Sequence, residues 1–330
     1  MAEFLTFDTD LTAVANAIRV KGGTSAQLIY PSGFVSAIQA IQTGITPKLV
    51  VTTTPGAAIT ATPAEGFKVV KGTAGADGMC TLELPKAGTW HVTAMANSVS
   101  NSQHIVIGTQ NMLLPLYHDT FANNTWEEII TVCRTGIAPD SWAVGDSKTM
   151  NIGGTAYQVD IIGKNHDEYA DGSGTAPLTF QLHDCYSEAK QMYSTNLSGL
   201  GWKNTDMRLT YLPAILALMP AEVKNGIHAV NKKTSEGGNS TTIETVSDTL
   251  FLLSEVEIFG TASSSVAGEG SQYDYYKAGN PKIKKREGVD EFWWERSSAS
   301  GGMFCRVRAN GQAGASNASN SLGVSFAFCF

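Results

Sequence analysis

The chain has 330 residues, of which 42% are hydrophobic, so it is long enough for two or three domains with ordinary cores. Its formal net charge of −7 argues against binding to a nucleic-acid backbone, and no nucleic-acid partner is expected. The N-terminal residues lack the basic and apolar regions of a signal peptide, and no apolar run approaches the roughly 18 residues of a membrane span. We therefore expect synthesis in the cytoplasm without membrane insertion. Any protein that acts at a cell surface without an export signal must leave the cell in another way, for example by lysis.

The cysteines are five in number, widely separated and without a C-x-x-C pair. This distribution argues against both a disulfide framework and a zinc site. Free, mostly buried thiols in a reducing cytoplasm fit it best. Pairing of Cys305 with Cys329 stays open as an alternative, because the two could meet if their strands are adjacent.

Residues 1–45 are predicted to form two short amphipathic helices. A pair of helices this small cannot bury both apolar faces alone, so we expect it to pack against a partner subunit or another copy. The apolar positions at helical spacing are Leu11, Val14, Ala15 and Ile18 in the first helix, and Phe34, Ala37, Ile38 and Ile41 in the second.

Residues 46–108 change to short strand-like runs separated by turn residues such as Pro55-Gly56, which predicts a small β-sandwich. The run GTWHVTA at 88–94 resembles the penultimate strand of an immunoglobulin-like spacer module. An apolar ligand interface is not expected in such a module. The predicted strands are 49–51, 67–70, 79–84, 90–94 and 104–107.

Residues 109–330 are predicted to form one larger α+β domain. A large share of loop residues, joined by few helices and strands, is typical of a domain specialised for the display of binding residues. The expected elements are a capped helix starting at Thr125, a strand at 155–162, a helix at 209–218 and a strand at 250–253, with polar loops at 234–242 and 261–272.

The segment 292–330 is the candidate contact surface. Residues 309–325 carry no charge and almost nothing bulky, so we expect a loop region that is held by its two ends and available for binding. Large apolar residues define the two ends. These are the aromatic anchor of Phe292, Trp293 and Trp294, and an alternating strand face of Val324, Phe326, Phe328 and Phe330.

Strand alternation predicts that Arg306 and Arg308 share one face, while Cys305 and Val307 share the other. A guanidinium can make forked hydrogen bonds to carboxylate or phosphate. We therefore expect the two arginines to be the strongest anchors of a ligand-binding patch.

Other charged motifs have plainer interpretations. The one basic run, Lys282 to Arg286, is followed at once by acidic residues and is predicted to be a solvated loop. The doublets His166-Asp167 and His183-Asp184 resemble those of metal-dependent phosphohydrolases, but they lack the further ligands that such a site needs. The acidic turn at 167–171 could hold calcium, yet its spacing does not fit an EF-hand loop, so an exposed turn is preferred. No cofactor or metal is expected.

Seven stretches occur in an order and at a spacing that resemble a C-type-lectin-fold domain frequent in bacteriophage and prophage tail proteins. They are WEEI (126–129), VGD (144–146), IGKNHD (162–167), LSEVEIFG (253–260), EGSQY (269–273), WERS (294–297) and GVS (323–325). Many members close with GVRPA, whereas this chain has GVSFA at 323–327. That departure resembles the variable proteins of diversity-generating retroelements, in which the lectin-fold C-terminus is diversified by templated mutagenesis. Residues 11–19 and 30–34 are similar to the start of many phage tail proteins.

The resemblance implies a multidomain α+β phage tail adhesin, a receptor-binding protein of the virion. Its parts would be a helical tail-attachment segment at 1–45, an immunoglobulin-like β-sandwich spacer at 46–108, and a C-type-lectin-fold ligand-binding domain at 109–330. The implied partners are a bacterial surface protein or glycan and, through the N-terminal segment, other tail proteins. A homo-oligomer is implied, with a trimer as the usual arrangement among tail fibres.

The diversified relatives also imply a division of the C-terminal segment into scaffold and display positions. The scaffold positions are Trp293, Trp294, Glu295, Arg296, Ser297, Phe304, Val307, Gly311, Gly323, Val324 and Phe326. The display positions, expected to bind ligand, are Ser298, Ala299, Ser300, Arg306, Arg308, Gln312, Gly314, Ala315, Ser316, Asn317 and Leu322.

Two other function classes remain as alternatives. The first is a structural tail or virion decoration protein without receptor binding. The second is an enzyme, because the same broad fold includes formylglycine-generating enzymes with closely placed cysteines. Here Cys305 and Cys329 are 24 residues apart, with no base beside either to lower a thiol pKa. Glu255 and Glu257 flank Val256 on an expected strand, and the resemblance makes them scaffold residues. We therefore expect no enzymatic activity.

Overall fold

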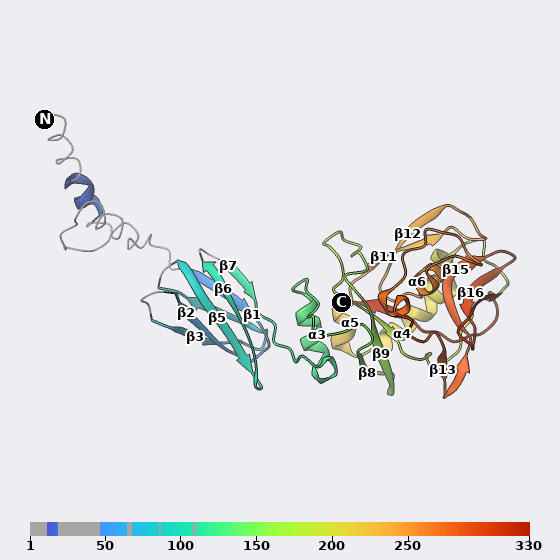
Figure 1. Ribbon diagram of the computed structural model, residues 1–330, viewed down its shortest axis with the longest axis horizontal. Helices are drawn as coiled ribbons and strands as arrows, with labels where there is room; N and C mark the ends of the chain where they lie inside the picture. Colours follow the sequence, from blue (N-terminus) through green and yellow to red (C-terminus); the bar gives the residue numbers. More distant parts are fainter. Residues whose placement is uncertain (1–11, 19–46, 65–67, 86, 108–109) are drawn as a thin grey trace, which may run out of the picture. The chain divides into compact units, whose positions relative to one another are not determined.

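The computed structural model of the protein describes residues 12–18, 47–64, 68–85, 87–107 and 110–330 (Figure 1). The chain divides into two compact units, with the division between Leu116 and Tyr117. Residues 12–18 form a helix in which Ala15 and Ile18 are buried, as the helical spacing predicts, whereas Val14 is 47% exposed, so its predicted place on the buried face is wrong. The second predicted N-terminal helix lies outside the described residues. None of the helices in the described ranges has the length and hydropathy needed to cross a membrane.

The N-terminal unit contains two β-sheets that share one hydrophobic core. The first has the order β4–β1–β7, with β1 (Lys48–Thr52) antiparallel to β4 (Met79–Glu83) and parallel to β7 (Gln110–Leu113). The second is antiparallel with the order β3–β2–β5–β6, made of β2 (Ala58–Pro63), β3 (Val70–Thr73), β5 (Gly88–Ala96) and β6 (Val99–Ile107).

Alternation along the strands explains why the two sheets pack face to face. Leu49 of β1 and Trp90 of β5 point into the shared core, with more exposed residues on either side of each. The sheets approach closely at Gly72, where an added Cβ would collide with the sulfur of Cys80. The predicted sandwich boundary at 108 is too early, because β7 pairs with β1 and carries this unit to Leu116.

The C-terminal unit, residues 117–330, is an α+β domain with its own core. Its largest sheet has the order β18–β10–β9–β8, made of β8 (Ser147–Ile152), β9 (Thr155–Lys164), β10 (Leu178–Leu182) and β18 (Ala327–Cys329). The remaining strands form the hairpin of β11 (Val230–Ser235) and β12 (Ile243–Asp248), the hairpin of β13 (Lys284–Arg286) and β14 (Val289–Glu291), and a three-stranded sheet of β15 (Trp293–Ala299), β16 (Met303–Val307) and β17 (Ala313–Asn317).

The helices of this unit are short. They are α3 (Trp126–Cys133), α4 (Leu212–Leu218), α5 (Ala221–Gly226), α6 (Glu255–Phe259) and α7 (Asp274–Lys277), with single helical turns at η1 (Phe121–Asn123) and η2 (Trp202–Asn204) and a π-helical segment, η3 (Met207–Tyr211), that runs into α4.

Two helices begin with reciprocal caps. Thr125 accepts the amide hydrogen of Glu128 at 3.2 Å, and the Glu128 carboxylate accepts the amide hydrogen of Thr125 at 2.7 Å, as predicted for the start of α3. Ser254 and Glu257 repeat this arrangement at α6. The strand expected around Glu255 and Glu257 is therefore wrong, although both carboxylates are buried as scaffold residues should be.

Three further predictions need correction. The apolar run 250–253 is buried but forms no strand, and only Phe251 makes a bridge, to Ala327. The predicted loop 309–325 contains β17, which pairs along its length with β16. The basic run is not a solvated loop throughout, because Lys284 is buried in β13 and donates to the carbonyl of His183 at 2.8 Å. Burial lowers the pKa of Lys284 to about 8.

Candidate functional site

The candidate site is the outer side of the hairpin formed by β16 and β17. Both turns of the three-stranded sheet depend on backbone that non-glycine residues rarely adopt. At Gly302, between β15 and β16, φ is +76° and an added Cβ would collide with the carbonyl oxygen of Asn196. The turn into β17 contains Gly311, whose φ is +80°, and is closed by the Arg308 amide, which donates to the carbonyl of Gln312 at 2.7 Å. The sequence therefore fixes the register of the hairpin at both of its ends.

Two arginines lie along this hairpin, and the paired strand orders both of them. Arg306 donates from Nε to the carbonyl of Ala315 at 3.2 Å, and Arg308 donates from Nε to the carbonyl of Ala313 at 3.1 Å. The guanidinium carbon of Arg306 also lies 4.2 Å from the centre of the Phe292 ring. Arg308 crosses Gly314, where an added Cβ would come within 2.8 Å of the arginine Nε.

No carboxylate in the described part of the chain pairs with Arg306 or Arg308, and none of their terminal nitrogens takes part in a hydrogen bond there. Partial burial, followed by the like charge of Arg308, lowers the pKa of Arg306. Two adjacent guanidinium groups without a counter-charge favour an anionic ligand, and their free terminal nitrogens can donate in a fork.

The predicted alternation is confirmed. Cys305 and Val307 are fully buried, whereas Arg306 is half-buried and Arg308 is exposed. Ser300, Gln312 and Asn317 are also exposed, and Ala315 and Leu322 are half-buried.

Four predicted display residues are buried instead. Ser298 and Ala299 lie in β15, whose residues are buried throughout, and the Ala299 carbonyl accepts a hydrogen bond from Ser198 at 2.8 Å. Gly314 lies beneath Arg308, and Ser316 is only 8% exposed. The prediction that these four residues are displayed to a ligand is therefore wrong. Their small size suits close packing between strands, so composition alone could not separate them from exposed residues.

The predicted scaffold positions form the frame behind the hairpin. All of them are buried apart from Gly311, which is half-buried in the second turn. Trp293 and Trp294 donate their indole hydrogens to the carbonyls of Lys282 at 3.0 Å and Lys190 at 2.8 Å. The frame therefore combines apolar burial with satisfied polar groups.

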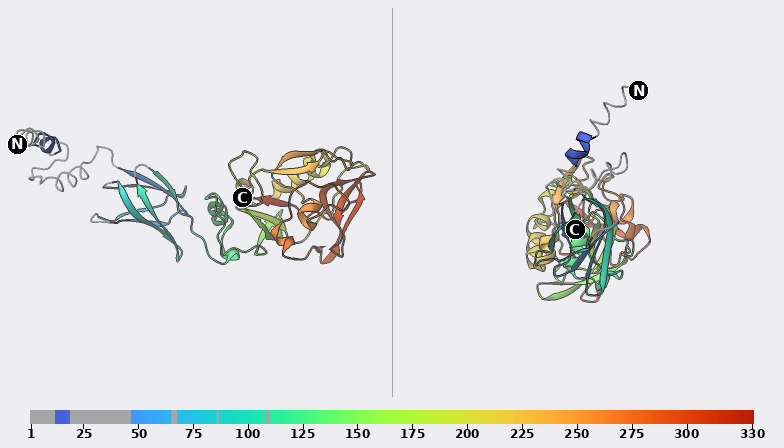
Figure 2. Two further views of the ribbon diagram at one scale, coloured as in Figure 1. Left: turned by 45° about the horizontal axis from the view of Figure 1, so that its top comes forward. Right: turned by 90° about the vertical axis from the view of Figure 1, so that its left-hand side faces the viewer.

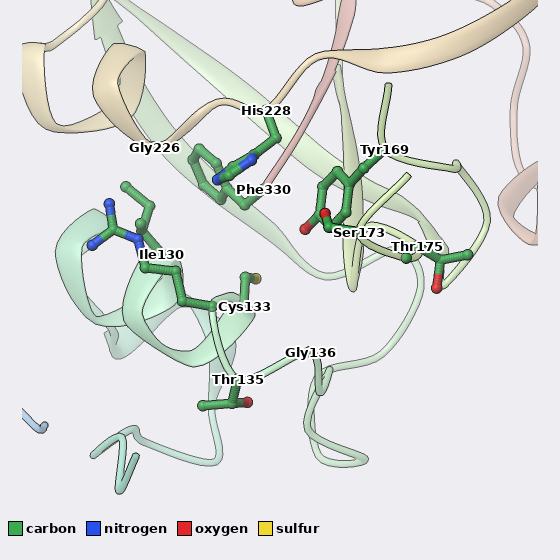
Figure 3. A pocket seen from close by; sticks show the side chains of 12 residues that line it. Ile130, Cys133, Thr135, Gly136, Tyr169, Ser173, Thr175, Gly226, His228 and Phe330 are labelled. Carbon is green, nitrogen blue, oxygen red and sulfur yellow. The ribbon is translucent and has the colours of Figure 1, made fainter. Parts of the chain in front are cut away.

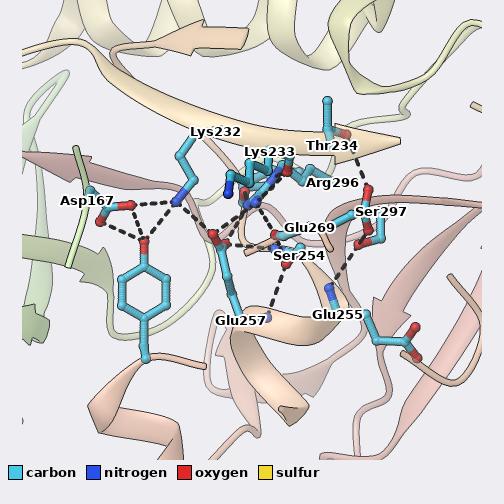
Figure 4. A network of polar contacts seen from close by, with 12 residues as sticks. Asp167, Lys232, Lys233, Thr234, Ser254, Glu255, Glu257, Glu269, Arg296 and Ser297 are labelled. Carbon is cyan, nitrogen blue, oxygen red and sulfur yellow. Dashed lines mark hydrogen bonds and ion pairs between the residues drawn. The ribbon is translucent and has the colours of Figure 1, made fainter. Parts of the chain in front are cut away.

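A buried ion network ties β15 to the rest of the unit (Figure 4). Arg296 of β15 donates to Glu257 of α6 at 2.9 Å and to the carbonyl of Lys233 in β11 at 3.0 Å. The ammonium group of Lys232 lies 2.7 Å from Glu257 and 2.6 Å from Asp167. Asp167 and Glu257 therefore each have a cation within hydrogen-bonding distance, as a buried charge requires.

The network holds Asp167 ionised. Burial opposes its ionisation, but the charge and hydrogen bond of Lys232 and the hydroxyl of Thr179 outweigh burial and lower the pKa of Asp167 to about 2. The hydroxyl of Tyr273 donates to the same carboxylate at 2.8 Å. Asp167 therefore points inward and is not part of the exposed acidic turn that the sequence suggested.

Glu295 is the exception in the frame. Both of its carboxyl oxygens are buried without a hydrogen-bond partner. Burial, followed by the nearby charges of Glu255 and Glu269, raises the pKa of Glu295 well above its usual value. The folded state therefore favours the neutral acid at this position.

The cysteines of the chain are free and buried, as predicted, and Cys305 does not pair with Cys329. Burial raises the pKa of the Cys305 thiol. Burial, followed by the charge of Asp167, raises the pKa of Cys329. Both groups therefore remain thiols, which are poor nucleophiles.

The His-Asp doublets do not converge on one site. The ring of His166 stacks on Tyr273, with centroids 3.9 Å apart, whereas His183 pairs with Asp160 at 2.7 Å between ring nitrogen and carboxylate. Hydrogen bonding to Asp160 raises the pKa of His183. Within the described ranges, no three His, Cys, Asp or Glu side chains are arranged to hold a metal ion.

Two contributions were not predicted from the sequence, one to the site and one to the frame behind it. Phe292 was expected only as an apolar anchor, although its ring supports the Arg306 guanidinium. Lys232, which belongs to the buried network, looks in the sequence like a surface residue of a polar strand. The available signal was its position in β11, where period-two alternation places Lys232 on the same face as buried Val230 and Thr234.

Taken together, the fold and the site define an α+β domain that holds a cationic hairpin on a buried frame. In the comparisons with known proteins, a family model described as a domain of unknown function (DUF6273) matches residues 179–330, which is less than half of the chain. The matched stretch includes the hairpin and the frame behind it. No curated protein and no solved structure matched the chain.

Proposed function

We propose that the protein is a phage tail adhesin that binds a receptor on the bacterial surface through the exposed side of the β16–β17 hairpin. In this proposal the C-terminal unit is a C-type-lectin-fold domain, the β-sandwich is an immunoglobulin-like spacer, and the N-terminal segment attaches to other tail proteins. The observation that carries the proposal is the arginine pair. Arg306 and Arg308 are ordered by the strand beside them and lack a carboxylate partner in the described residues.

The receptor group is proposed to be anionic, a carboxylate or phosphate of a surface protein or glycan. Hydrogen bonds from both Nε atoms to β17 carbonyls restrict the two side chains before any ligand arrives. Binding then loses less side-chain entropy, which for a mobile arginine costs about 0.5–1.5 kcal/mol. The terminal nitrogens stay available for the ligand.

Affinity at a single site is proposed to be modest and to be raised by repetition. The residues beside the arginines are small or polar and bury little apolar area on contact. Several copies on one virion, with a homotrimer as the proposed unit, would convert weak sites into firm attachment by avidity.

The hairpin is also proposed to tolerate replacement of its exposed residues, as in the variable proteins of diversity-generating retroelements. Support comes from the separation of roles along the chain. The residues that hold the sheet together are buried, whereas Ser300, Arg308, Gln312 and Asn317 are exposed. Substitutions at exposed positions away from caps and networks usually change stability by less than about 0.5 kcal/mol.

Replacing both arginines by alanine (Arg306→Ala with Arg308→Ala) is expected to reduce adhesion of the full-length protein to host cells by about tenfold or more, because each lost forked contact weakens binding by about 1 kcal/mol or more. The measurement is flow cytometry of fluorescently labelled protein on a panel of candidate host bacteria. A matched control removes the same charge from exposed helical lysines, Lys224→Ala with Lys277→Ala, and should bind like the wild type.

Equal loss in both double variants would point to a general charge effect and would count against the hairpin. If the wild type binds no host across the panel, a structural or decoration role in the virion becomes the better account.

A further inference from the structure

A separate cavity lies at another part of the C-terminal unit, between α3, the loop 169–175 and the segment that follows α5 (Figure 3). Its volume is about 480 Å³, within the range of about 300–1,000 Å³ that is typical of small-molecule sites. Its apolar lining comes from Ile130, Cys133 and Phe330, and its polar lining includes Arg134, Thr135, Tyr169, Ser173, Thr175 and His228.

The two faces of this cavity differ in chemistry. Ile130, Cys133 and Phe330 are buried and form its apolar side. Arg134 and Tyr169 are more exposed, and in the described residues no hydrogen bond or ion pair engages the Arg134 guanidinium or the Tyr169 hydroxyl. The cavity therefore joins an apolar surface to hydrogen-bond donors that are free for a ligand.

Asp171, an acidic residue in the loop beside the cavity, is held by that loop. Asp171 accepts the amide hydrogen of Ser173 at 2.9 Å. Hydrogen bonds from Ser173, with a smaller contribution from nearby His228, lower the pKa of Asp171. The ring of His228 lies against Tyr169, with centroids 5.1 Å apart. The carboxylate is thus already engaged, whereas the Arg134 charge is not.

We propose that this cavity binds a small organic anion, with its carboxylate or phosphate at Arg134 and an apolar body against Ile130, Cys133 and Phe330. No covalent step is involved, because burial raises the pKa of the Cys133 thiol and keeps it protonated. A cation at the carboxyl end of α3 also suits the helix dipole, which explains an arginine at this position but not the open apolar cavity beside it.

The cavity does not depend on the proposed adhesin function. It shares no residue with the β16–β17 hairpin. The views also place α3 and β15–β16 at opposite ends of the C-terminal unit (Figures 1 and 2). A ligand in the cavity would therefore be a second ligand, distinct from the receptor.

The test uses four probes on the full-length protein, measured by ligand-observed saturation-transfer NMR. Phenylacetate and phenyl phosphate carry both an anion and an apolar ring, acetate lacks the ring, and 2-phenylethanol lacks the charge. Phenylacetate and phenyl phosphate should each bind with a dissociation constant on the order of 1 mM. The other two probes should bind at least about tenfold more weakly. The stronger of the two anionic probes identifies the preferred acid group.

Two variants separate this site from non-specific binding. Arg134→Gln removes the charge and should weaken binding of the stronger anionic probe by about tenfold. Thr175→Trp should fill the cavity with a larger side chain and prevent binding. Arg306→Ala with Arg308→Ala should bind the probe like the wild type, so failure of the adhesin proposal and failure of this one remain distinguishable. The proposal would be overturned if neither anionic probe gave a saturation-transfer signal at about 10 mM, or if Arg134→Gln bound the stronger probe as well as the wild type does.

Discussion

Lys232→Met is expected to lower the free energy of unfolding of the C-terminal unit by about 3–5 kcal/mol, a large part of the total for a domain of this size. Lys232 lies between Asp167 and Glu257 and is 2% exposed. Its ammonium group is also 4.3 Å from the centre of the Phe251 ring. Methionine fills similar space but leaves the Asp167 carboxylate buried without a cation. The low pKa of Asp167, about 2, shows how strongly the folded state relies on that cation.

The measurement is urea denaturation of the full-length protein followed by tryptophan fluorescence, since five of the six tryptophans lie in the C-terminal unit. Lys203→Met is the matched control. Lys203 pairs with Glu244 at 2.9 Å, but its side chain is 53% exposed, so its removal should cost less than about 1 kcal/mol. A similar small effect from both variants would mean that the buried network contributes little to stability.

Glu295→Met is expected to stabilise the protein by about 2–4 kcal/mol at pH 7.5, because methionine removes a buried carboxyl group that has no hydrogen-bond partner. The gain should depend on pH. Folding raises the pKa of Glu295, so the wild type keeps the stability of the neutral acid in full below the pKa of glutamate in the unfolded chain, about 4.3. The wild type loses this stability as the pH rises toward the pKa of Glu295 in the folded protein. The slope of that loss is at most about 1.4 kcal/mol per pH unit.

The test compares denaturation midpoints of wild type and Glu295→Met between pH 4.5 and 7.5, with exposed Glu222→Met as the control. The advantage of Glu295→Met should grow with pH, while the control should show no trend. A constant difference, or a variant that is less stable at pH 7.5, would show that Glu295 is ionised and paired in the folded protein.

The sequence predicted the frame well because its signals are local and strong. Aromatic residues at 292–294 and the period-two pattern at 324–330 could only be accommodated in a core, and they are buried except for half-buried Phe292. The prediction for the C-terminal strand was nevertheless incomplete. Ser325, Ala327 and Cys329 are buried too, because other segments cover the second face of this strand.

The errors arose where tertiary contacts override local preference. Strand β17 consists of Ala, Gly, Ser and Asn, which have low intrinsic strand propensity, and its pairing with β16 compensates for that. The apolar run 250–253 has the composition of a strand, but its carbonyls serve separate partners. The Leu252 carbonyl accepts from the Arg296 side chain and the Leu253 carbonyl from the Arg296 amide, both within 2.9 Å.

The candidate site was predicted in outline but not in detail. The exposure of Arg308 and the partial exposure of Arg306 followed from alternation, whereas the burial of Ser298 and Ser316 did not. Small polar residues occur equally in turns and between closely packed strands. Only the pairing of both serines with Phe304, one from β15 and one from β17, shows that they lie inside the sheet.

The central claim is that a rigid buried frame presents a surface whose residues can be exchanged without loss of the fold. The most direct test is one variant in which Arg306, Arg308, Gln312 and Asn317 are all alanine, measured both for host-cell binding and for urea denaturation. We expect adhesion to be lost while the free energy of unfolding changes by less than about 1 kcal/mol. A variant that still adheres, or one that loses more than about 3 kcal/mol of stability, would contradict the claim.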